Sequence, residues 1–513
     1  ALLSAHQAIG VPQPVKLFGS EALKKEYLPR CAKGALSAFA LTEPAVGSDP
    51  GTLQTMATES EDGEHWVLDG QKLWCTNGTL AELLVVMARN PKTDRINAFV
   101  VETKWPGVKV EHRCRFMGLK ALANAQVSFT QVKVPKGNLI GGEGMGLKIA
   151  LVTLNTGRLT LPAATAGGVK YALEVARKWC EARVQWGRPI GQHEAIAHKL
   201  SDLATHAFAM EAVAELLGHL ADRPKTDIRL EAAAAKEWNT STQWQMLDEL
   251  LQIRGGRGYE TAASLEARGE APIPVERLMR DARINLIFEG SSEIMHLFMA
   301  REAVDKHLQV AGAMVSPKAT LVDKLKALPK VLAFYAWWYP TRWLSIAPWP
   351  KYGEHGVLAK HLRFAERAAG RLSRAVFHGM LRYQARLERK QAFLFRAVDV
   401  AMELFVLCAA VSKAHALRKA GQPGASEAVQ LADVFARGAA RRVQALLKAM
   451  WSNDDDAKVA VARQVMGGAL TWLEQGIMGL DFTAKQLEPM TVEAWRAARG
   501  EPQPQAVRPP HAA

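Results

Sequence analysis

The pattern of apolar and polar residues changes several times along the chain. Between residues 35 and 145, short alternating runs rich in Val, Thr and Gly predict β-strands, for example Trp66–Leu68, Ala98–Val101 and Ala125–Phe129. Turn-forming pairs at Asp62-Gly63, Asp69-Gly70 and Asn77-Gly78 are expected to separate the strands. This part of the chain therefore predicts a small β domain, built as a barrel or a sandwich.

The rest of the chain has apolar residues at three- and four-residue spacing, which is typical of amphipathic helices. Helices are predicted over residues 1–34, 146–311 and 356–500, with Gly-rich interruptions at Gly255–Gly258 and Gly290. Residues 312–355 form a linker rich in aromatic residues and prolines, and the proline-rich residues 501–513 are predicted to be a disordered tail. The expected fold class is α+β and mainly α.

The composition is that of an ordinary globular protein with room for about three domains: 513 residues, 49% of them hydrophobic and 23% charged. Five cysteines without CxxC spacing argue against a disulfide framework or a metal site. No signal-peptide pattern and no apolar run of about 18 residues is found, so we expect a soluble or peripheral protein.

The net charge of +14 has several interpretations. It is typical of a basic, solvated surface, and it is also typical of a protein that meets an anionic membrane, a nucleic acid or a polyanionic ligand such as CoA. The basic residues form no single stripe, so nucleic acid is the least favoured of these partners.

Three motifs carry more specific information: Leu41–Asp49 (LTEPAVGSD) with Trp74–Gly78 (WCTNG), Gln252–Tyr259 (QIRGGRGY), and Arg280–Ile294 (RDARINLIFEGSSEI). Each one alone is compatible with an ordinary loop or helix cap. Their order and spacing closely resemble the acyl-CoA dehydrogenase family over residues 2–307. The resemblance implies FAD as cofactor, a four-helix-bundle dehydrogenase domain over residues 146–311, and a homodimer or larger oligomer.

The β-domain motifs match the flavin-binding segments of that family. The resemblance implies that Thr42 and Thr76 hydrogen-bond the flavin, that Trp74 packs on it, and that Ser48 lies where flavin and acyl-CoA meet. An aromatic wall and fixed donors are what a flavin site needs; the alternative is that Trp74 is a core aromatic. Val46 departs from the small residue usual in the family. The residues that this match assigns to the cofactor in the β domain are Phe39, Leu41, Thr42, Ser48, Trp74, Cys75 and Thr76.

Glu289 is the candidate catalytic base. The α-C–H of a fatty acyl thioester is a very weak acid, so its removal needs a carboxylate of raised basicity beside a polarised carbonyl. Glu289 follows the apolar run Ile284–Phe288, which favours desolvation, and Gly290 lets substrate approach the backbone. The resemblance assigns the base to Glu289; the alternative is a helix-capping role.

Some branches of the family carry the base immediately before an arginine that matches Arg158. Here Gly157 occupies that position and has no carboxylate, which favours Glu289. The resemblance implies acyl-CoA contacts for Asn155, Arg158, Gly290 and Ser48. It implies FAD diphosphate and adenosine contacts, some from a neighbouring subunit, for Arg183, Gln252, Gly256, Ser291, Ser292 and Glu293.

Residues 356–500 resemble the extra C-terminal helical domain of the very-long-chain branch. Family members open with a further N-terminal helical domain, and residues 1–34 are expected to be the remnant of it. The linker at 312–355 holds eight aromatic residues among lysines and arginines, and its prolines are expected to prevent one long helix. Such a segment suits an anionic membrane surface, or else packs on the helical core. The very-long-chain branch uses the corresponding region for membrane association.

We therefore expect an enzyme of fatty acid β-oxidation that converts a fatty acyl-CoA, long-chain rather than short-chain, to trans-2-enoyl-CoA. Electrons are expected to pass to an electron-transfer flavoprotein, in the bacterial cytoplasm or the mitochondrial matrix. The alternatives are an acyl-CoA oxidase, and a non-catalytic member of the fold that acts in assembly or with DNA.

Overall fold

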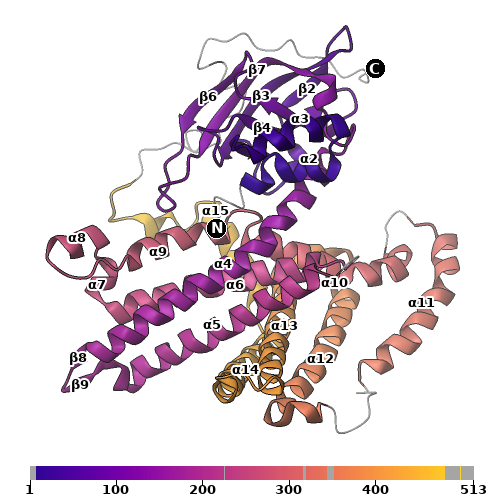
Figure 1. The fold of residues 1–513 in the computed structure, drawn as a ribbon. Helices are drawn as coiled ribbons and strands as arrows, with labels where there is room; N and C mark the ends of the chain where they lie inside the picture. The colour runs from indigo at the N-terminus through magenta and orange to yellow at the C-terminus, as the bar shows by residue number, and fades with distance from the viewer. Residues whose placement is uncertain (1–6, 224–225, 316–318, 344–351, 480–496, 498–513) are drawn as a thin grey trace. The chain divides into compact units, whose positions relative to one another are not determined.

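The computed structural model describes the chain except for residues 1–6, 224–225, 316–318, 344–351, 480–496 and 498–513 (Figure 1). The chain divides into two compact units, one of residues 1–160 with 479–513 and the other of residues 161–478. The predicted tail at 501–513 and part of the aromatic linker lie outside the described residues. Each unit is considered by itself.

The first unit is built on a seven-stranded sheet with the strand order β1-β4-β2-β3-β7-β6, in which β5 also pairs with β4. This arrangement confirms the predicted β domain. The strands are β1 (Ser37–Ala40), β2 (Met56–Glu59), β3 (His65–Cys75), β4 (Leu83–Asn90), β5 (Arg95–Glu102), β6 (Val108–Arg113) and β7 (Ala125–Pro135), with short 3₁₀ turns η1 (Pro50–Thr52) and η2 (Lys136–Asn138).

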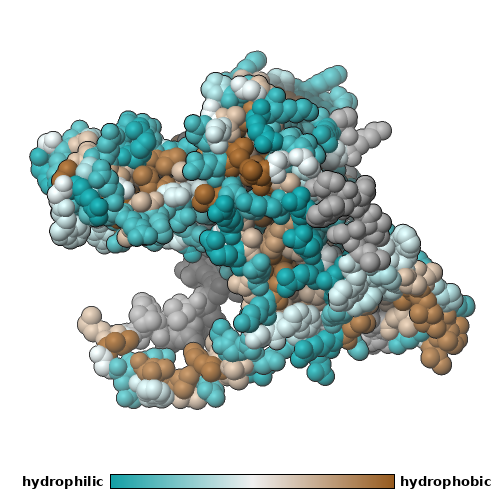
Figure 2. Space-filling view, turned by 90° about the horizontal axis from the view of Figure 1, so that it is seen from below, coloured by the Kyte–Doolittle hydropathy of each residue, from teal (hydrophilic) through white to brown (hydrophobic). Residues whose placement is uncertain are grey.

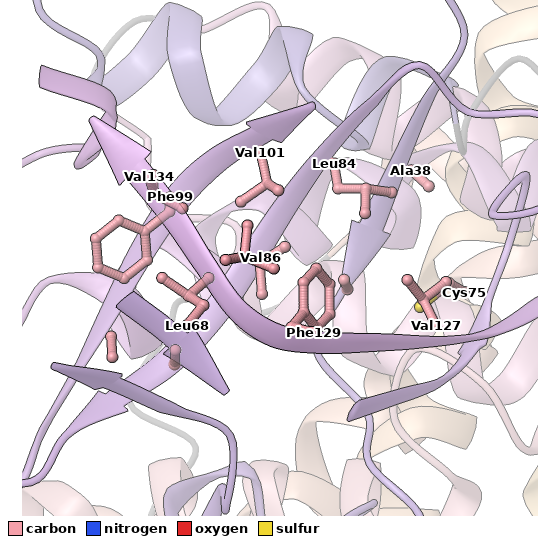
Figure 3. Close-up of a cluster of buried hydrophobic side chains, with 14 of the residues drawn as sticks. Ala38, Leu68, Cys75, Leu84, Val86, Phe99, Val101, Val127, Phe129 and Val134 are labelled. Atoms are coloured by element: carbon pink, nitrogen blue, oxygen red, sulfur yellow. The ribbon is translucent and has the colours of Figure 1, made fainter. Parts of the chain in front are cut away.

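Strands β4 and β5 are buried on both faces of this sheet. Because successive side chains of a strand point to opposite faces, Leu84, Val86, Phe99 and Val101 belong to one core cluster, which Figure 3 shows with Phe129. Their neighbours Leu83, Val85, Met87, Ala98 and Val100 belong to a second cluster. The nearly continuous apolar sequence of these strands follows from this double burial.

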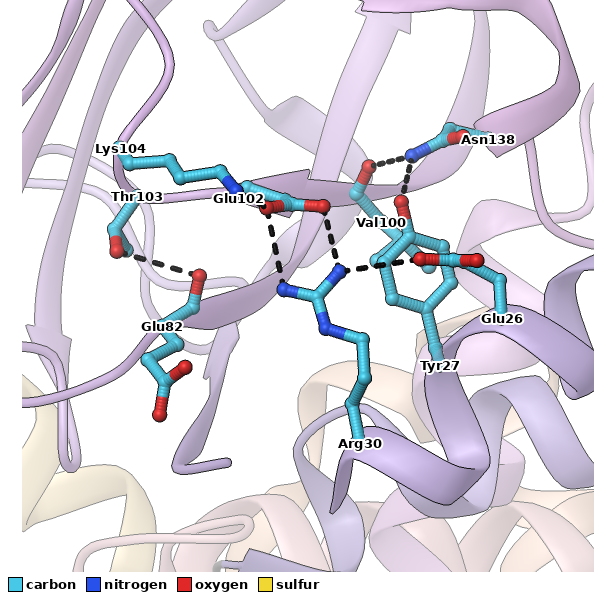
Figure 4. Close-up of polar contacts among 9 residues, drawn as sticks. All are labelled: Glu26, Tyr27, Arg30, Glu82, Val100, Glu102, Thr103, Lys104 and Asn138. Carbon is cyan, nitrogen blue, oxygen red and sulfur yellow. Dashed lines mark hydrogen bonds and ion pairs between the residues drawn. The ribbon is translucent and has the colours of Figure 1, made fainter. Parts of the chain in front are cut away.

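Helices α2 (Pro12–Phe18) and α3 (Glu21–Ala32) contribute Val15, Leu23 and Tyr27 to the second cluster. Polar contacts fix α3 on the sheet (Figure 4). Arg30 donates to both carboxylate oxygens of Glu102, at 2.7 and 3.2 Å, and the Asn138 amide donates to Tyr27 Oη and to the Val100 carbonyl, both at 2.8 Å. The bidentate geometry is the strong form of this ion pair.

The prediction of a turn at Asp69-Gly70 was wrong. Strand β3 continues through both residues, and its pairing with β7 shifts register between Leu68 and Gly70, which marks a β-bulge. Gly70 has φ of +145° and its Cα lies so close to Thr55 that an added Cβ would come within 2.7 Å. A glycine in a strand often marks such a close backbone approach rather than a chain reversal.

The second unit is helical. Its long helices are α4 (Gly146–Ala182, which begins in the first unit), α5 (Glu194–Ala221), α6 (Arg229–Arg254), α10 (Ser292–Val315), α11 (Leu321–Thr341), α12 (Ala359–Tyr383), α13 (Gln391–Lys419) and α14 (Ala425–Ala449). Shorter elements are β8 (Val184–Gln185), β9 (Arg188–Pro189), η3 (Ile190–Gln192), α7 (Gly256–Tyr259), α8 (Ala262–Ala267), α9 (Val275–Ala282), η4 (Arg283–Leu286), η5 (Gly353–Leu358), η6 (Gln384–Arg389), α15 (Asp455–Met466) and η7 (Thr471–Glu474).

Helix α13 lies at the centre of the C-terminal part and contacts α5, α10, α12 and α14. Its apolar residues from Phe393 to Ala414 are buried on several sides of the helix, which explains why this stretch is hydrophobic nearly all round. Among the described residues, no helix is long and apolar enough to cross a membrane.

The described part of the aromatic linker is not one long helix, as expected, because α11 ends at Thr341, but Pro329 does not interrupt that helix. Helix α11 runs for 21 residues through Pro329, although proline removes a backbone donor and normally breaks a helix. Packing offsets this cost. Phe334, Tyr335 and Trp338 make ring contacts with one another, and both Tyr335 and Trp338 pack against Phe377 of α12. A capping box between Thr320 and Asp323 fixes the start of the helix.

The loop after β1 is held by a buried ion pair. The ammonium group of Lys72, which is fully buried in β3, lies 2.7 Å from the Glu43 carboxylate and donates to the Leu41 carbonyl at 3.1 Å. Glu43 also accepts from the backbone N–H groups of Gln54 and Thr55. Burial raises the pKa of Glu43, but Lys72 and these donors outweigh it, so the pKa lies below its ordinary value.

We predict that Lys72→Met destabilises the protein by about 3–5 kcal/mol, because it leaves the Glu43 charge buried without its partner. The double variant Lys72→Met/Glu43→Gln should recover much of this loss, since it removes the unpaired charge and keeps an acceptor for the backbone donors. Thermal and urea unfolding of the two variants measure the difference. Equal stability of the single and double variants would contradict this account.

Candidate active site

The first group of candidate residues lies where β1 and β3 end. Phe39 is in β1, Leu41 and Thr42 follow it, Trp74 and Cys75 close β3, and Thr76 comes next. The backbone N–H of Leu73 donates to the Thr42 carbonyl at 2.8 Å. This bond brings the two motifs, some thirty residues apart in sequence, side by side.

The backbone of Trp74 is in a left-handed conformation that residues other than glycine rarely adopt. Its φ is +57°, and its side chain is 56% exposed. A left-handed backbone at a bulky residue costs about 1–3 kcal/mol, and such strain gathers at functional sites. The core-aromatic alternative for Trp74 is therefore wrong, because an exposed indole held in a strained turn offers a flat wall to a ligand.

The neighbours of Trp74 divide into exposed and buried groups. Ser48 is exposed, and Thr76 is half-buried and accepts from the Asn124 amide at 3.2 Å. Val46 is buried and closes a tight turn through reciprocal backbone hydrogen bonds with Glu43, so its size does not disturb the loop. The Cys75 thiol is buried in the core, and burial raises its pKa to about 12.

Glu289 and Gly290 lie in the second unit, between η4 and α10. Both have left-handed backbones, with φ of +54° and +98°. The ammonium group of Lys236, on α6 and fully buried, donates to the Gly290 carbonyl at 2.8 Å. Beside it the Asn285 amide donates to Gln243 at 3.0 Å. These contacts with α6 fix the backbone that carries the candidate base.

Ser291, Ser292 and Glu293 form the start of α10. The Met295 N–H donates to the Ser291 carbonyl, and the pKa of Glu293 lies below its ordinary value because its own backbone N–H and the Ser291 hydroxyl stabilise the carboxylate. The Ser292 hydroxyl is buried and has no hydrogen-bond partner among the described residues. A free hydroxyl at a helix N-terminus fits the phosphate of a dinucleotide cofactor.

Trp179 of α4 brings the remaining cofactor candidates together. Its indole N–H donates to the Ile253 carbonyl at 3.2 Å, and the Arg183 guanidinium lies 6.0 Å from its ring. Gln252 and Gly256, on either side of Ile253 in the sequence, are both exposed. The space beside Gly256 is open, because a Cβ added there would have no atom within 4 Å. An arginine beside an open glycine turn is well suited to a diphosphate, so these residues also fit the cofactor.

The candidates on α4 are Asn155 and Arg158, three residues apart on the helix. Arg158 is buried, at 8% exposure. Gly157 precedes it and supplies no acid or base.

Sequence reasoning missed Lys72, Lys236 and Trp179 as supports of the site. Lys72 directly precedes the apolar residues Leu73–Cys75 in a strand, and Lys236 follows the run Ala232–Ala235 on a helix. A lone lysine at a position where the pattern demands burial is the signal that points to such residues. Trp179 carries no comparable signal, because aromatic residues are common in cores.

Comparison with protein-family models assigns most of the chain. The acyl-CoA dehydrogenase middle domain matches residues 38–132, the acyl-CoA dehydrogenase C-terminal domain matches residues 144–304, and the ACAD9/ACADV C-terminal domain matches residues 357–468. The three models cover the sheet, the helices that carry Glu289, and the C-terminal helices.

Individual relatives agree. The chain is 53% identical over 483 residues to the "Probable acyl-CoA dehydrogenase FadE10" of Mycobacterium tuberculosis, which covers 93% of this chain and 74% of the relative. It is 32% identical over 464 residues to the mitochondrial very long-chain specific acyl-CoA dehydrogenase of Homo sapiens, with 88% and 68% covered.

A solved structure shows the same fold. An acyl-CoA dehydrogenase from Bacillus anthracis, in complex with FAD, superposes with a TM-score of 0.71 at 28% identity and covers 90% of this chain and 76% of that one. The domain models match most of the chain, and the relatives are similar to it over most of their own length. The left-handed turns at Trp74 and Glu289 lie within the matched segments. This chain belongs to the acyl-CoA dehydrogenase family of FAD-dependent oxidoreductases.

Proposed function

We propose that this protein dehydrogenates a long-chain fatty acyl-CoA to its trans-2-enoyl-CoA, with Glu289 as the catalytic base and an electron-transfer flavoprotein as the electron acceptor. The backbone at Glu289 is the observation that carries the proposal. A carboxylate on a left-handed turn, next to a carbonyl held by buried Lys236, is positioned by the fold rather than by its own preference.

Glu289 removes the α-proton of the thioester, and the electrons of that C–H bond form the new double bond as hydride leaves the β-carbon. When bound, FAD supplies the acceptor for that hydride. The residues that would hold the cofactor are Thr42, Trp74 and Thr76 in the first unit, and Arg183, Gln252 and Ser292 in the second. Arg158, buried on α4, would contact the acyl-CoA; the side chain of Asn155, assigned the same role, lies outside the part that the structure describes. Gly157 leaves Glu289 without a competing base.

The C-terminal helices support a long-chain substrate. Residues 357–468 match the domain that the ACAD9/ACADV model describes, and the human very long-chain enzyme is among the relatives. A solved structure of an electron transferring flavoprotein of Acidaminococcus fermentans, similar to this chain with a TM-score of 0.53, supports the choice of acceptor. An oxidase is the competing outcome.

We also propose that the protein acts as a homodimer or larger oligomer. The hairpin of β8 and β9 carries Trp186, which is 90% exposed at a φ of +47°. Arg183 precedes the hairpin, and His193 behind it donates to the Gln185 carbonyl. A strained, almost fully exposed tryptophan beside a cofactor-type arginine suits contact with a second copy, because exposed indoles are favoured in interfaces.

Helix α11 supports a peripheral membrane contact. Leu321, Leu325, Leu332 and Trp337 are 60–75% exposed, and Trp343, just after the helix, is 61% exposed. On the face shown in Figure 2, apolar residues gather at the right-hand end, where Figure 1 places α11. Trp338 instead packs on Phe377, so the structure separates it from the surface rings that the sequence grouped with it. Lysines near an anionic surface add about 1 kcal/mol each.

For the base, we predict that Glu289→Gln keeps bound FAD and acyl-CoA affinity but slows flavin reduction by at least about a hundredfold, the scale of general-base catalysis. Anaerobic stopped-flow mixing with palmitoyl-CoA follows the bleaching of the flavin. The matched control is Glu302→Gln, an exposed glutamate on α10. Near-normal reduction by Glu289→Gln would place the base elsewhere.

For the acceptor, we predict that reduced enzyme with enoyl product bound reacts slowly with oxygen and quickly with an electron-transfer flavoprotein. A closed, product-filled site excludes the solvent through which oxygen would arrive. Oxygen electrode and dye-coupled assays measure the two rates. One hydrogen peroxide released per turnover would favour the oxidase.

For the membrane, we predict that the protein co-sediments with anionic vesicles and that Trp337→Ser/Trp343→Ser abolishes this without unfolding the protein. Trp472→Ser, which removes another 61% exposed tryptophan, is the matched control and should sediment normally. Trp338→Ser should instead lower the melting temperature, because it opens the aromatic cluster. Full sedimentation of the double variant would assign membrane binding to another surface.

A further inference from the structure

A cavity lies in the helical unit, between α4, the end of α6 and the segment after α8. Its volume is about 400 Å³, within the usual range of about 300–1,000 Å³ for small-molecule sites. Much of its wall is apolar or aromatic, formed by Tyr171, Val175, Trp179, Ala271 and Ile273. The proposed dehydrogenation assigns no role to Arg254 or to the apolar wall, although Trp179 also lies beside the cofactor candidate Arg183.

Arg254 is the unusual residue in the wall. Its side chain is only 6% exposed, its guanidinium lies 4.4 Å from the ring centre of Trp179, and its Nε has no hydrogen-bond partner. In the part of the chain that the structure describes, the guanidinium makes no ion pair. Burial lowers the pKa of Arg254 and the neighbouring Arg257 lowers it further, while the more distant attraction of Glu270 only partly opposes them. A buried charge without a partner is strongly destabilising.

The other charges around the cavity are already paired. Lys178 bonds Glu174 at 2.6 Å, and Glu270 accepts from Arg257 at 2.6 and 2.8 Å and from Arg268 at 2.9 Å. Arg268 also pairs with Glu260 at 2.8 Å. Four cations, counting Arg254, therefore face the three carboxylates of Glu174, Glu260 and Glu270, and one positive charge remains uncompensated. Two of these carboxylates, Glu174 and Glu270, line the cavity. A single negative charge balances this site, whereas a dianion would be repelled by Glu174 and Glu270.

We propose that the cavity binds a small carboxylic acid with an apolar body, as its monoanion. The carboxylate pairs with the guanidinium of Arg254, a match of two planar groups that allows two parallel hydrogen bonds. The apolar body lies against Tyr171, Val175 and Ile273, where it loses contact with water. The site is separate from Glu289 and stands whether or not Glu289 is the base.

The test uses the full chain with FAD bound and 4-phenylbutyrate as the probe. Its neutral analogue 4-phenylbutyramide has the same body without the charge. Isothermal titration calorimetry should show binding of the acid and at least about tenfold weaker binding of the amide, the scale of one charged hydrogen-bonded contact. Arg254→Met and Arg254→Gln should each weaken binding of the acid by at least about tenfold.

The matched control is Lys178→Met, which removes a paired cation from the same wall and should change affinity by less than about threefold. Stability gives a second measurement. Without the probe, Arg254→Met should melt no lower than the unmodified protein, because it removes an uncompensated buried charge. The probe should raise the melting temperature of the unmodified protein and leave that of Arg254→Met unchanged.

Four outcomes would overturn the proposal. Equal affinity for acid and amide would show that the charge is not recognised. A lower melting temperature of Arg254→Met without the probe would assign the guanidinium to packing on Trp179. Binding of inorganic phosphate that depends on Arg254, in preference to the acid, would contradict the choice of a carboxylate. Loss of bound FAD from Arg254→Met and Arg254→Gln would assign Arg254 to the cofactor, since Gln252 and Gly256 flank it in sequence.

Discussion

Buried lysines that donate to loop carbonyls hold the two segments that carry the principal candidate site residues. Lys72 donates to the Leu41 carbonyl at 3.1 Å, and Lys236 donates to the Gly290 carbonyl at 2.8 Å. In each case a regular element, β3 or α6, carries the ammonium, and the loop carries the candidate site residues. A hydrogen bond from a charged donor is stronger in a buried environment than in water, so it fixes a loop more firmly than a neutral contact.

This anchoring explains how the structure tolerates strain where it does. Trp74 and Glu289 both have left-handed backbones, each at a cost of about 1–3 kcal/mol, and each lies beside one of the anchored segments. Without the anchors, these turns would relax to ordinary conformations and redirect the indole and the carboxylate. The left-handed turns and the buried lysines therefore act together. The turns lower the stability of each unit, and in return they fix the directions of the Trp74 and Glu289 side chains.

The aromatic residues of the C-terminal half serve two different purposes. Trp338 and Tyr335 pack with Phe377 and offset the proline inside α11, whereas Trp337 on the same helix is 74% exposed. Adjacent residues on a helix point about 100° apart, so one faces the core and its neighbour faces solvent. Trp179 shows a third use, because its ring gathers Arg183, Arg254 and Arg257 around a single apolar surface.

The sequence by itself determined the β domain and the helical remainder, and it singled out Glu289 as the candidate base, because strand alternation, helical spacing and ordered motifs are local properties of the chain. It did not determine the Asp69-Gly70 bulge, the continuation of α11 through Pro329, or the lysine anchors. Lys72 reaches Glu43 across 29 residues and Lys236 reaches Gly290 across 54. The periodicity of the sequence indicates which face of a helix or strand a residue occupies. Only the tertiary structure decides which residue it contacts on that face, and whether a buried charge such as Arg254 has a counter-charge.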